Sequence, residues 1–169
     1  MKFNKFNLSE DILKSLKDLD YINATKVQER VIPEMLLNKD IIAKAQTGTG
    51  KTAAFGLPML NNIANRKAIS SIILAPTREL AIQVHDELVK LAKYEKLNVV
   101  AVYGGAPIHN QIRDIKKANI VVGTPGRVLD HIRRGTLPLD SVEFLVLDEA
   151  DEMLNMGFID DMEEIMKSI

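Results

Sequence analysis

The sequence predicts an α/β fold in which a mainly parallel sheet is covered by helices on both faces. From residue 41 onward, short apolar runs alternate with amphipathic helical patterns. The runs are rich in β-branched residues and lack apolar–polar alternation, which is typical of buried parallel strands. Ligands of such sheets bind at the carboxyl ends of the strands. The residues that follow each strand are therefore the first candidates for a functional site.

Two amphipathic helices are predicted before the first strand, because apolar residues recur there every three or four positions. Thr25 is a candidate N-cap of the second helix, and Gln28 occupies the capping-box position three residues later. Pro33 predicts a kink or a break in that helix. We therefore divide the chain into a helical segment, residues 1–38, and an α/β domain, residues 39–169.

The α/β domain contains five predicted strands joined by helices and short polar turns. The predicted strands are residues 41–43, 71–75, 99–102, 120–122 and 144–147. The predicted helices are residues 52–64, with a kink at Pro58, and residues 79–92, 108–117, 128–134 and 159–169.

Composition limits the possible classes of function. The 169 residues are 46% hydrophobic and 27% charged, which indicates one globular domain with a sizeable core. The absence of cysteine excludes disulfides and thiolate metal sites, and it suits the cytoplasm. The net charge is −1, so a nucleic acid must contact a local basic surface. No apolar run is long enough to span a bilayer, and we expect a cytoplasmic protein without membrane contact.

A glycine-rich loop follows the first predicted strand and opens a helix, which is the context of a phosphate-binding loop. Gly48 and Gly50 permit backbone angles that turn successive N–H groups toward an anion. Lys51 is expected to reach the β- and γ-phosphates of a nucleotide, and the Thr52 hydroxyl to bind Mg²⁺. A tight turn before a helix is the alternative, and the pattern favours phosphate binding.

An acidic pair ends the fifth predicted strand. Asp148 is placed to hold Mg²⁺ through water, and Glu149 to polarise the water that attacks a phosphate. A solvated acidic helix start is the alternative, because Asp and Glu favour the first turn of a helix. The phosphate loop in the same chain favours the metal-and-base interpretation.

The tetrapeptide Asp-Glu-Ala-Asp at residues 148–151 is the signature of the DEAD-box ATP-dependent RNA helicases. Nearly the whole chain resembles the first RecA-like P-loop domain of bacterial members of that family, in the order and spacing of its motifs. Residues 45–52 resemble motif I, in which the family also begins with alanine. Residues 25–28 resemble the Q motif, 76–80 motif Ia, 104–105 the GG motif and 124–127 motif Ib.

The resemblance implies ATP and Mg²⁺ as cofactors, with Glu149, Lys51 and Asp148 as catalytic residues. It also implies that Gln28 hydrogen-bonds adenine and that Phe3 stacks on the adenine ring. From the residues alone, helix capping by Gln28 and simple packing of Phe3 are equally open. The implied nucleotide-binding residues are Phe3, Gln28, Gln46, Thr47, Gly48, Thr49, Gly50, Lys51 and Thr52, with Thr52 and Asp148 holding the metal.

The resemblance further implies contacts with the RNA backbone, which are salt-sensitive and tolerant of sequence. The alternative for Arg78 is a salt bridge with a nearby acid. The implied RNA-binding residues are Pro76, Thr77, Arg78, Gly104, Gly105, Thr124, Pro125, Gly126 and Arg127. The histidines His85, His109 and His131 lack metal-ligand spacing, and we interpret them as surface residues.

The family's next strand carries Ser-Ala-Thr, and this tripeptide does not occur in the sequence. We therefore expect an incomplete first RecA-like domain, followed in the natural protein by a second that supplies arginine fingers. Because such a finger contributes about 10³–10⁵ in turnover, the 169-residue chain alone is expected to hydrolyse ATP very slowly. The complete protein would unwind or remodel RNA. Two alternatives are an ATP-dependent RNA clamp that does not unwind, and a P-loop ATPase that acts on protein or DNA.

Overall fold

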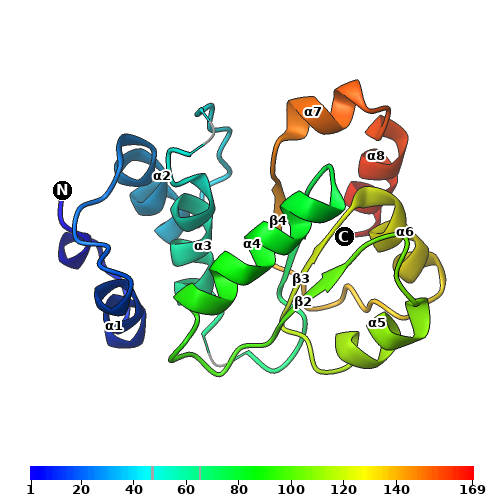
Figure 1. The fold of residues 1–169 in the computed structure, drawn as a ribbon, viewed down its shortest axis with the longest axis horizontal. Helices are drawn as coiled ribbons and strands as arrows, with labels where there is room; N and C mark the ends of the chain where they lie inside the picture. Colours follow the sequence, from blue (N-terminus) through cyan, green and yellow to red (C-terminus); the bar gives the residue numbers. More distant parts are fainter. Residues whose placement is uncertain (47, 65) are drawn as a thin grey trace. The chain divides into compact units, whose positions relative to one another are not determined.

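The computed structural model describes residues 1–46, 48–64 and 66–169, which form two compact units (Figure 1). Unit 1 consists of Met1–Asn65 and Glu87–Lys96, and unit 2 consists of Arg66–Asp86 and Leu97–Ile169. The helix α4, Arg78–Leu91, contributes to both units. These units divide the chain at positions other than the predicted boundary between residues 38 and 39, which stays a prediction.

Unit 1 is helical. Its elements are η1 (Phe3–Lys5), α1 (Glu10–Asp18), α2 (Lys26–Leu36), α3 (Lys51–Asn62) and the last part of α4. The predicted capping box is confirmed, because Thr25 Oγ1 accepts a hydrogen bond from Gln28 N and Gln28 Oε1 accepts one from Thr25 N. The helix α2 continues through Pro33, so the predicted break is wrong. Only three helical residues follow this proline, which limits what its missing N–H can disturb.

Residues 41–43 were predicted as the first strand, and this prediction is wrong. All three residues are exposed, and the Ile42 side chain is fully accessible. A strand is stable only when its N–H and C=O groups pair with those of a neighbour. The sheet formed by the described residues provides no such neighbour for this segment. Apolar character alone therefore did not make the segment a strand.

Unit 2 contains a parallel four-stranded sheet in the order β2-β3-β1-β4. The strands are β1 (Ser71–Leu74), β2 (Val99–Val102), β3 (Ile120–Gly123) and β4 (Phe144–Leu147), close to the predicted bounds. Their register is even. Leu74 lies opposite Gly123 and Leu147, and Gly123 also lies opposite Val102. All four strands therefore end at the same level.

Three helices of unit 2 gather on one side of this sheet: α5 (Ile108–Ile115), α6 (Pro125–Arg133) and α8 (Ile159–Ser168) (Figure 1). Ile72 and Val121 project from the strands into the same buried cluster as Ile115, Leu129 and Ile165 of these helices. Ile73 and Val122, which alternate to the other face, are also completely buried. Burial on both faces explains why the strands show no polar alternation. The helix α6 begins three residues before its predicted start, because Pro125 occupies the first helical position.

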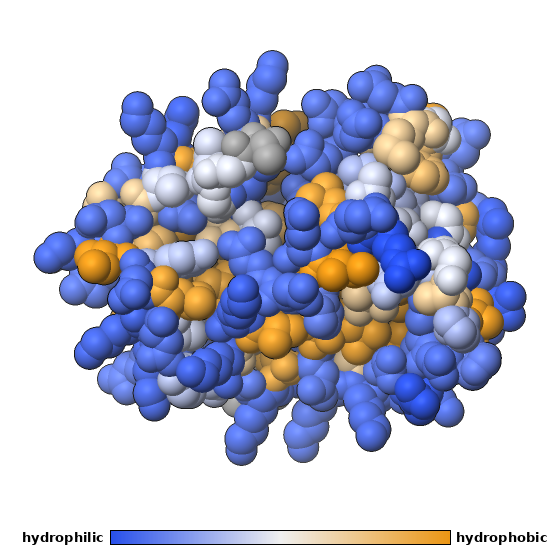
Figure 2. Space-filling model, viewed as in Figure 1, coloured by the Kyte–Doolittle hydropathy of each residue, from blue (hydrophilic) through white to orange (hydrophobic). Residues whose placement is uncertain are grey.

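No helix of the described residues is long and apolar enough to cross a membrane. In Figure 2, hydrophilic side chains cover most of the visible surface, and hydrophobic residues show between them in separate areas. The exposed large hydrophobic residues include Leu37, Ile42, Leu154 and Met156.

Candidate functional site

Four loops of unit 2 leave the same edge of the sheet. The even register brings the ends of β2, β3, β1 and β4 to one level, in that spatial order. The loop with the glycine pair therefore lies next to the loop that follows β3, then the loop at residues 75–77, and finally Asp148. The sequence predicted this gathering from strand ends alone, and the prediction is confirmed for these four loops.

The loop after β1 presents a cation that is already oriented. Arg78, at the start of α4, is exposed and lies with its guanidinium carbon 4.7 Å from the centre of the Tyr103 ring. This contact joins the loop after β1 to the loop after β2 through a cation–π interaction. Thr77 Oγ1 accepts a hydrogen bond from Leu80 N at 3.2 Å, so Thr77 caps α4. Its hydroxyl hydrogen remains able to donate to an anion.

The glycines of the site lie in open positions. Gly105 has a φ of 84°, and a Cβ added at Gly104 or Gly105 would meet no atom within 4 Å. Gly126 is exposed in the first turn of α6, where an added Cβ would come no closer than 3.9 Å to another atom. Thr124, the N-cap residue, makes no capping hydrogen bond with its side chain. Backbone N–H groups at this helix start can meet an anion.

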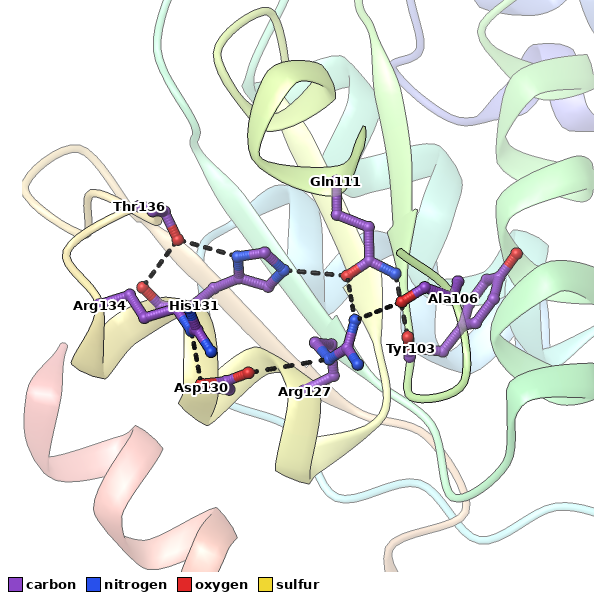
Figure 3. Close-up of polar contacts among 8 residues, drawn as sticks. All are labelled: Tyr103, Ala106, Gln111, Arg127, Asp130, His131, Arg134 and Thr136. Carbon is purple, nitrogen blue, oxygen red and sulfur yellow. Dashed lines mark hydrogen bonds and ion pairs between the residues drawn. The ribbon is translucent and has the colours of Figure 1, made fainter. Parts of the chain in front are cut away.

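Arg127 is held inside unit 2 rather than directed into solvent. Its Nη1 donates to Ala106 O at 3.0 Å and to Gln111 Oε1 at 3.1 Å, and its Nε lies 3.9 Å from Asp130 Oδ2 (Figure 3). Only 16% of the side chain is exposed. The predicted direct contact of Arg127 with RNA stays a prediction, and its described contacts fasten the glycine loop to α5 and α6.

His131 was interpreted as a surface residue, and this is wrong. The side chain is completely buried on α6, with Nδ1 2.8 Å from Thr136 Oγ1 and Nε2 2.9 Å from Gln111 Oε1. Burial lowers the pKa of His131, and the nearby charge of Arg127 lowers it further. The sequence did contain one signal of this network. Gln111 lies three residues after Ile108 and four before Ile115, which places a polar residue on the apolar face of α5.

The phosphate loop lies in unit 1 and begins α3. Gly48 and Gly50 have φ values of 82° and 80°, and Gly50 is the N-cap of a helix that starts at Lys51. Lys51 and Thr52 are half-buried in the first turn, and Gln46 and Thr49 lie beside the glycines. Thr47 lies outside the described residues. A helix start preceded by two glycines with positive φ fits an anion.

Gln28 connects the Q-motif helix to this loop. Its Nε2 donates to Gly50 O at 3.1 Å, while its Oε1 serves the capping box. The side chain is 4% exposed. A Cβ on Gly50 would lie 2.4 Å from Gln28 Nε2, so only glycine fits at this approach.

Phe3 is buried in unit 1, with 3% of its surface exposed and its ring centre 6.1 Å from that of Phe6. The packing interpretation therefore describes Phe3 in this structure. Stacking on adenine requires one face of the ring to be uncovered, and it stays a prediction.

The acidic pair follows β4 in unit 2. Asp148 N donates to Leu74 O at 2.9 Å, which extends the sheet ladder to the acidic residue. Glu149 has a φ of 54° and is the N-cap of α7 (Ala150–Asn155), a short helix that the sequence did not predict. A left-handed conformation at a residue other than glycine is strained, and such strain is common at functional sites. No cluster of three metal-binding side chains occurs among the described residues, but Mg²⁺ is often bound by one or two carboxylates together with phosphates and water.

Comparison with known families decides the classification. The model of the DEAD/DEAH box helicase family matches residues 25–169. The chain belongs to the DEAD/DEAH box helicase family. This helicase-family chain is 59% identical to the "ATP-dependent RNA helicase CshA" of Listeria monocytogenes and 53% identical to the "DEAD-box ATP-dependent RNA helicase CshA" of Bacillus subtilis, over 99% of its own length. It spans about a third of the length of these curated relatives, 33% and 34%.

Solved structures support the RecA-like α/β fold of this helicase-family chain. The crystal structure of a DEAD box protein from Methanococcus jannaschii matches 99% of it with a TM-score of 0.96 and 50% identity. A hypothetical ATP-dependent RNA helicase from Sulfolobus tokodaii matches 95% of it with a TM-score of 0.90 and 40% identity. The matched part is 47% of each of those two chains.

In this helicase-family chain, Gly50→Ala should destabilise unit 1 more than Gly48→Ala. Both substitutions place alanine at the same φ, which costs about 1–2 kcal/mol. Only the Gly50 variant also forces its Cβ against Gln28 Nε2, whereas a Cβ at Gly48 meets no atom within 4 Å. Thermal unfolding without nucleotide measures the difference. Equal shifts in the two midpoints would show that the contact with Gln28 adds nothing.

His131 should make the helicase-family chain less stable below neutral pH. Because its pKa is lowered in the folded state, the unfolded chain binds the proton first as pH falls. The stabilisation is complete above the unfolded pKa of about 6.5 and is lost as pH falls toward the folded pKa. Arg127, Asp130 and Arg134 are the charged groups around the ring, and only Asp130 opposes this direction.

The measurement compares unfolding midpoints at pH about 7.5 and about 5.5 for wild type and His131→Gln. The variant should lose less stability on acidification. The matched control is His109→Gln, the same exchange at an exposed position of α5. A His131→Gln protein with the wild-type pH response would contradict the prediction.

Proposed function

We propose that this chain is the ATP-binding and RNA-contacting module of an ATP-dependent RNA helicase. The observation that carries the proposal is the set of aligned strand ends in unit 2, which gathers three candidate RNA loops and the acidic pair at one edge. The names of the relatives from Listeria and Bacillus support the same activity. Because the chain spans about a third of those relatives, the proposal assigns the complete activity to the intact protein, with a second RecA-like domain beyond this chain.

The proposed nucleotide site uses the phosphate loop and the Q-motif helix. Backbone N–H groups of Gln46 and residues 48–50 would surround the phosphates, and Lys51 would neutralise their charge. Gln28 has one unused N–H on Nε2 and one unused lone pair on Oε1, so its carboxamide can still pair with adenine. Phe3 is proposed to stack on the base after its ring separates from Phe6.

The proposed reaction is in-line attack of water on the γ-phosphate. Thr52 and Asp148 are each candidate ligands of Mg²⁺, which would neutralise charge on the phosphate oxygens. Glu149 orients the attacking water and accepts its proton. The left-handed backbone conformation of Glu149 sets the direction in which its side chain leaves the chain, two residues after the end of β4. The arginine fingers that complete the charge stabilisation are assigned to the second RecA-like domain.

The proposed RNA site uses three loops of unit 2. Arg78 supplies the exposed charge, Thr77 and Thr124 supply hydroxyl donors, and residues 104–105 and 126 supply accessible backbone N–H groups. Contacts of this kind bind phosphates and carry little base information. RNA binding by the intact protein should therefore depend on salt much more than on sequence.

Glu149→Gln in the intact protein should preserve ATP binding and reduce turnover by about 10²–10⁴-fold, because the amide cannot accept the proton of water. Nucleotide affinity and RNA-stimulated phosphate release are the two measurements. The matched control is Glu152→Gln, the same exchange at an exposed position of α7. Unchanged turnover would remove Glu149 from the proposed role. A wild-type protein that retains RNA with ATP but separates no duplex would favour the clamp alternative.

Arg78→Gln should weaken binding to single-stranded RNA and make it less dependent on salt. Loss of one phosphate contact reduces the slope of log affinity against log salt by about 0.7. Arg113→Gln is the control. This substitution removes the same charge from an exposed position in the last turn of α5. If the Arg78→Gln protein has the same salt slope as the control, Arg78 does not contact an RNA phosphate. Competition by single-stranded DNA in the presence of ATP tests the choice of nucleic acid.

A further inference from the structure

The carboxamide of Gln111 is the centre of a buried hydrogen-bond network in unit 2 (Figure 3). Gln111 lies on α5 and is 6% exposed. Its Nε2 donates to Tyr103 O at 2.9 Å. Its Oε1 accepts from Arg127 Nη1 at 3.1 Å and from His131 Nε2 at 2.9 Å. Residues from α5, α6 and the loop after β2 therefore meet at one side chain.

The orientation of this carboxamide is determined by its neighbours. Arg127 can only donate hydrogen bonds, so the atom that faces it must be the oxygen of Gln111. The same oxygen then requires a hydrogen on Nε2 of His131, which fixes the tautomer of the neutral ring. Thr136 Oγ1, 2.8 Å from Nδ1, holds the other side of the ring. A reversed amide would place its N–H groups against the guanidinium of Arg127 and its oxygen against Tyr103 O, and the Nε2 of Gln111 is therefore directed to Tyr103.

The network fastens both ends of the glycine pair. Gln111 holds the carbonyl of Tyr103 directly before Gly104, and Arg127 holds the carbonyl of Ala106 directly after Gly105. An added Cβ at either glycine would meet no atom within 4 Å, so neighbouring atoms do not enclose the two glycines. The ring of Tyr103 in turn carries the guanidinium of Arg78. One buried amide thus connects the three loops that are proposed to contact RNA.

We propose that Gln111, oriented by Arg127, is a positioning residue for RNA binding that fixes the glycine loop and Arg78 in the geometry of a phosphate site. This inference rests on the proposed RNA surface of unit 2. Gln111 itself is too deeply buried to touch RNA. Fixing the loop before RNA arrives removes an ordering cost from binding, so loosening it should weaken affinity without removing any charge.

The alternative role for the network is purely structural, since buried polar groups need hydrogen-bond partners in any protein. The two roles differ in what a substitution changes. Loss of structure lowers the fraction of active protein and therefore the maximal rate. Loss of positioning raises the RNA concentration that gives half-maximal stimulation of ATP hydrolysis. The experiment therefore has to separate these two quantities.

The test substitutes Gln111→Glu in the intact protein and measures ATP hydrolysis as a function of polyuridylate concentration. The carboxylate keeps both acceptor contacts, to Arg127 and His131, and loses only the donor to Tyr103 O. The half-saturating RNA concentration should rise about tenfold, the loss expected when one buried hydrogen bond no longer orders the loop. The matched control is Gln83→Glu, which adds the same charge at an exposed position of α4. Equal RNA dependence in the two variants would overturn the inference.

A second variant covers the case in which the new charge prevents folding. Gln111→Met is uncharged and similar in size, and it removes all three hydrogen bonds. Retained affinity for a fluorescent ADP analogue shows that the nucleotide site is folded in either variant. A folded Gln111→Met protein with wild-type half-saturating RNA would overturn the inference, and a raised value would support it.

Comparison with Arg78→Gln separates this inference from the proposed function. If Arg78→Gln weakens RNA binding and the Gln111 variants do not, RNA binds the proposed surface and only the positioning role fails. If Arg78→Gln has no effect, the surface itself fails. In a double variant, Gln111→Glu should add little to Arg78→Gln, because the two residues act through the same contact. Fully additive effects would count against the link through Tyr103.

Discussion

The parallel pairing of four strands in even register is the constraint on which the rest of unit 2 depends. Each backbone N–H and C=O of a buried strand requires a partner, and parallel pairing supplies it only when neighbouring strands run at one level. The consequence is chemical as well as structural. The loops after β1, β2 and β3 and the acidic residue after β4 leave the sheet together. Residues separated by more than 70 positions thus become neighbours at one edge.

In each unit, one glutamine side chain hydrogen-bonds to a glycine-containing loop. Gln28 uses its oxygen for the capping box and its nitrogen for the carbonyl of Gly50, so a helix start and a phosphate loop share one side chain. Gln111 uses its oxygen for two donors and its nitrogen for the carbonyl before the glycine pair. A carboxamide suits both places because it donates and accepts at once. Glycine has no side chain to pack, and in both loops a glutamine side chain holds a backbone carbonyl instead.

Several interpretations of the sequence failed where a residue's neighbours come from distant segments. His131 was assigned to the surface because nothing near it in sequence suggests burial, yet Gln111 from α5 and Thr136 enclose its ring. The guanidinium of Arg127, whose contact with RNA stays a prediction, is directed inward, to Ala106 and Gln111. Residues 41–43 have the composition of a strand, but no described strand pairs with them. A local sequence pattern indicates which structure a segment favours. Contacts with distant segments decide whether that structure forms.

The sequence by itself determined the fold class, the four strands of the sheet, the capping box of α2 and the family. These features depend on period, on apolar composition and on short motifs, which are properties of consecutive residues. Only the tertiary structure decided that Arg127 and His131 turn inward, that Phe3 is buried and that Gln111 joins three loops. The reason is that a hydrogen bond or a buried ring requires a second group at a defined distance and angle, and a linear pattern does not specify which residue arrives there.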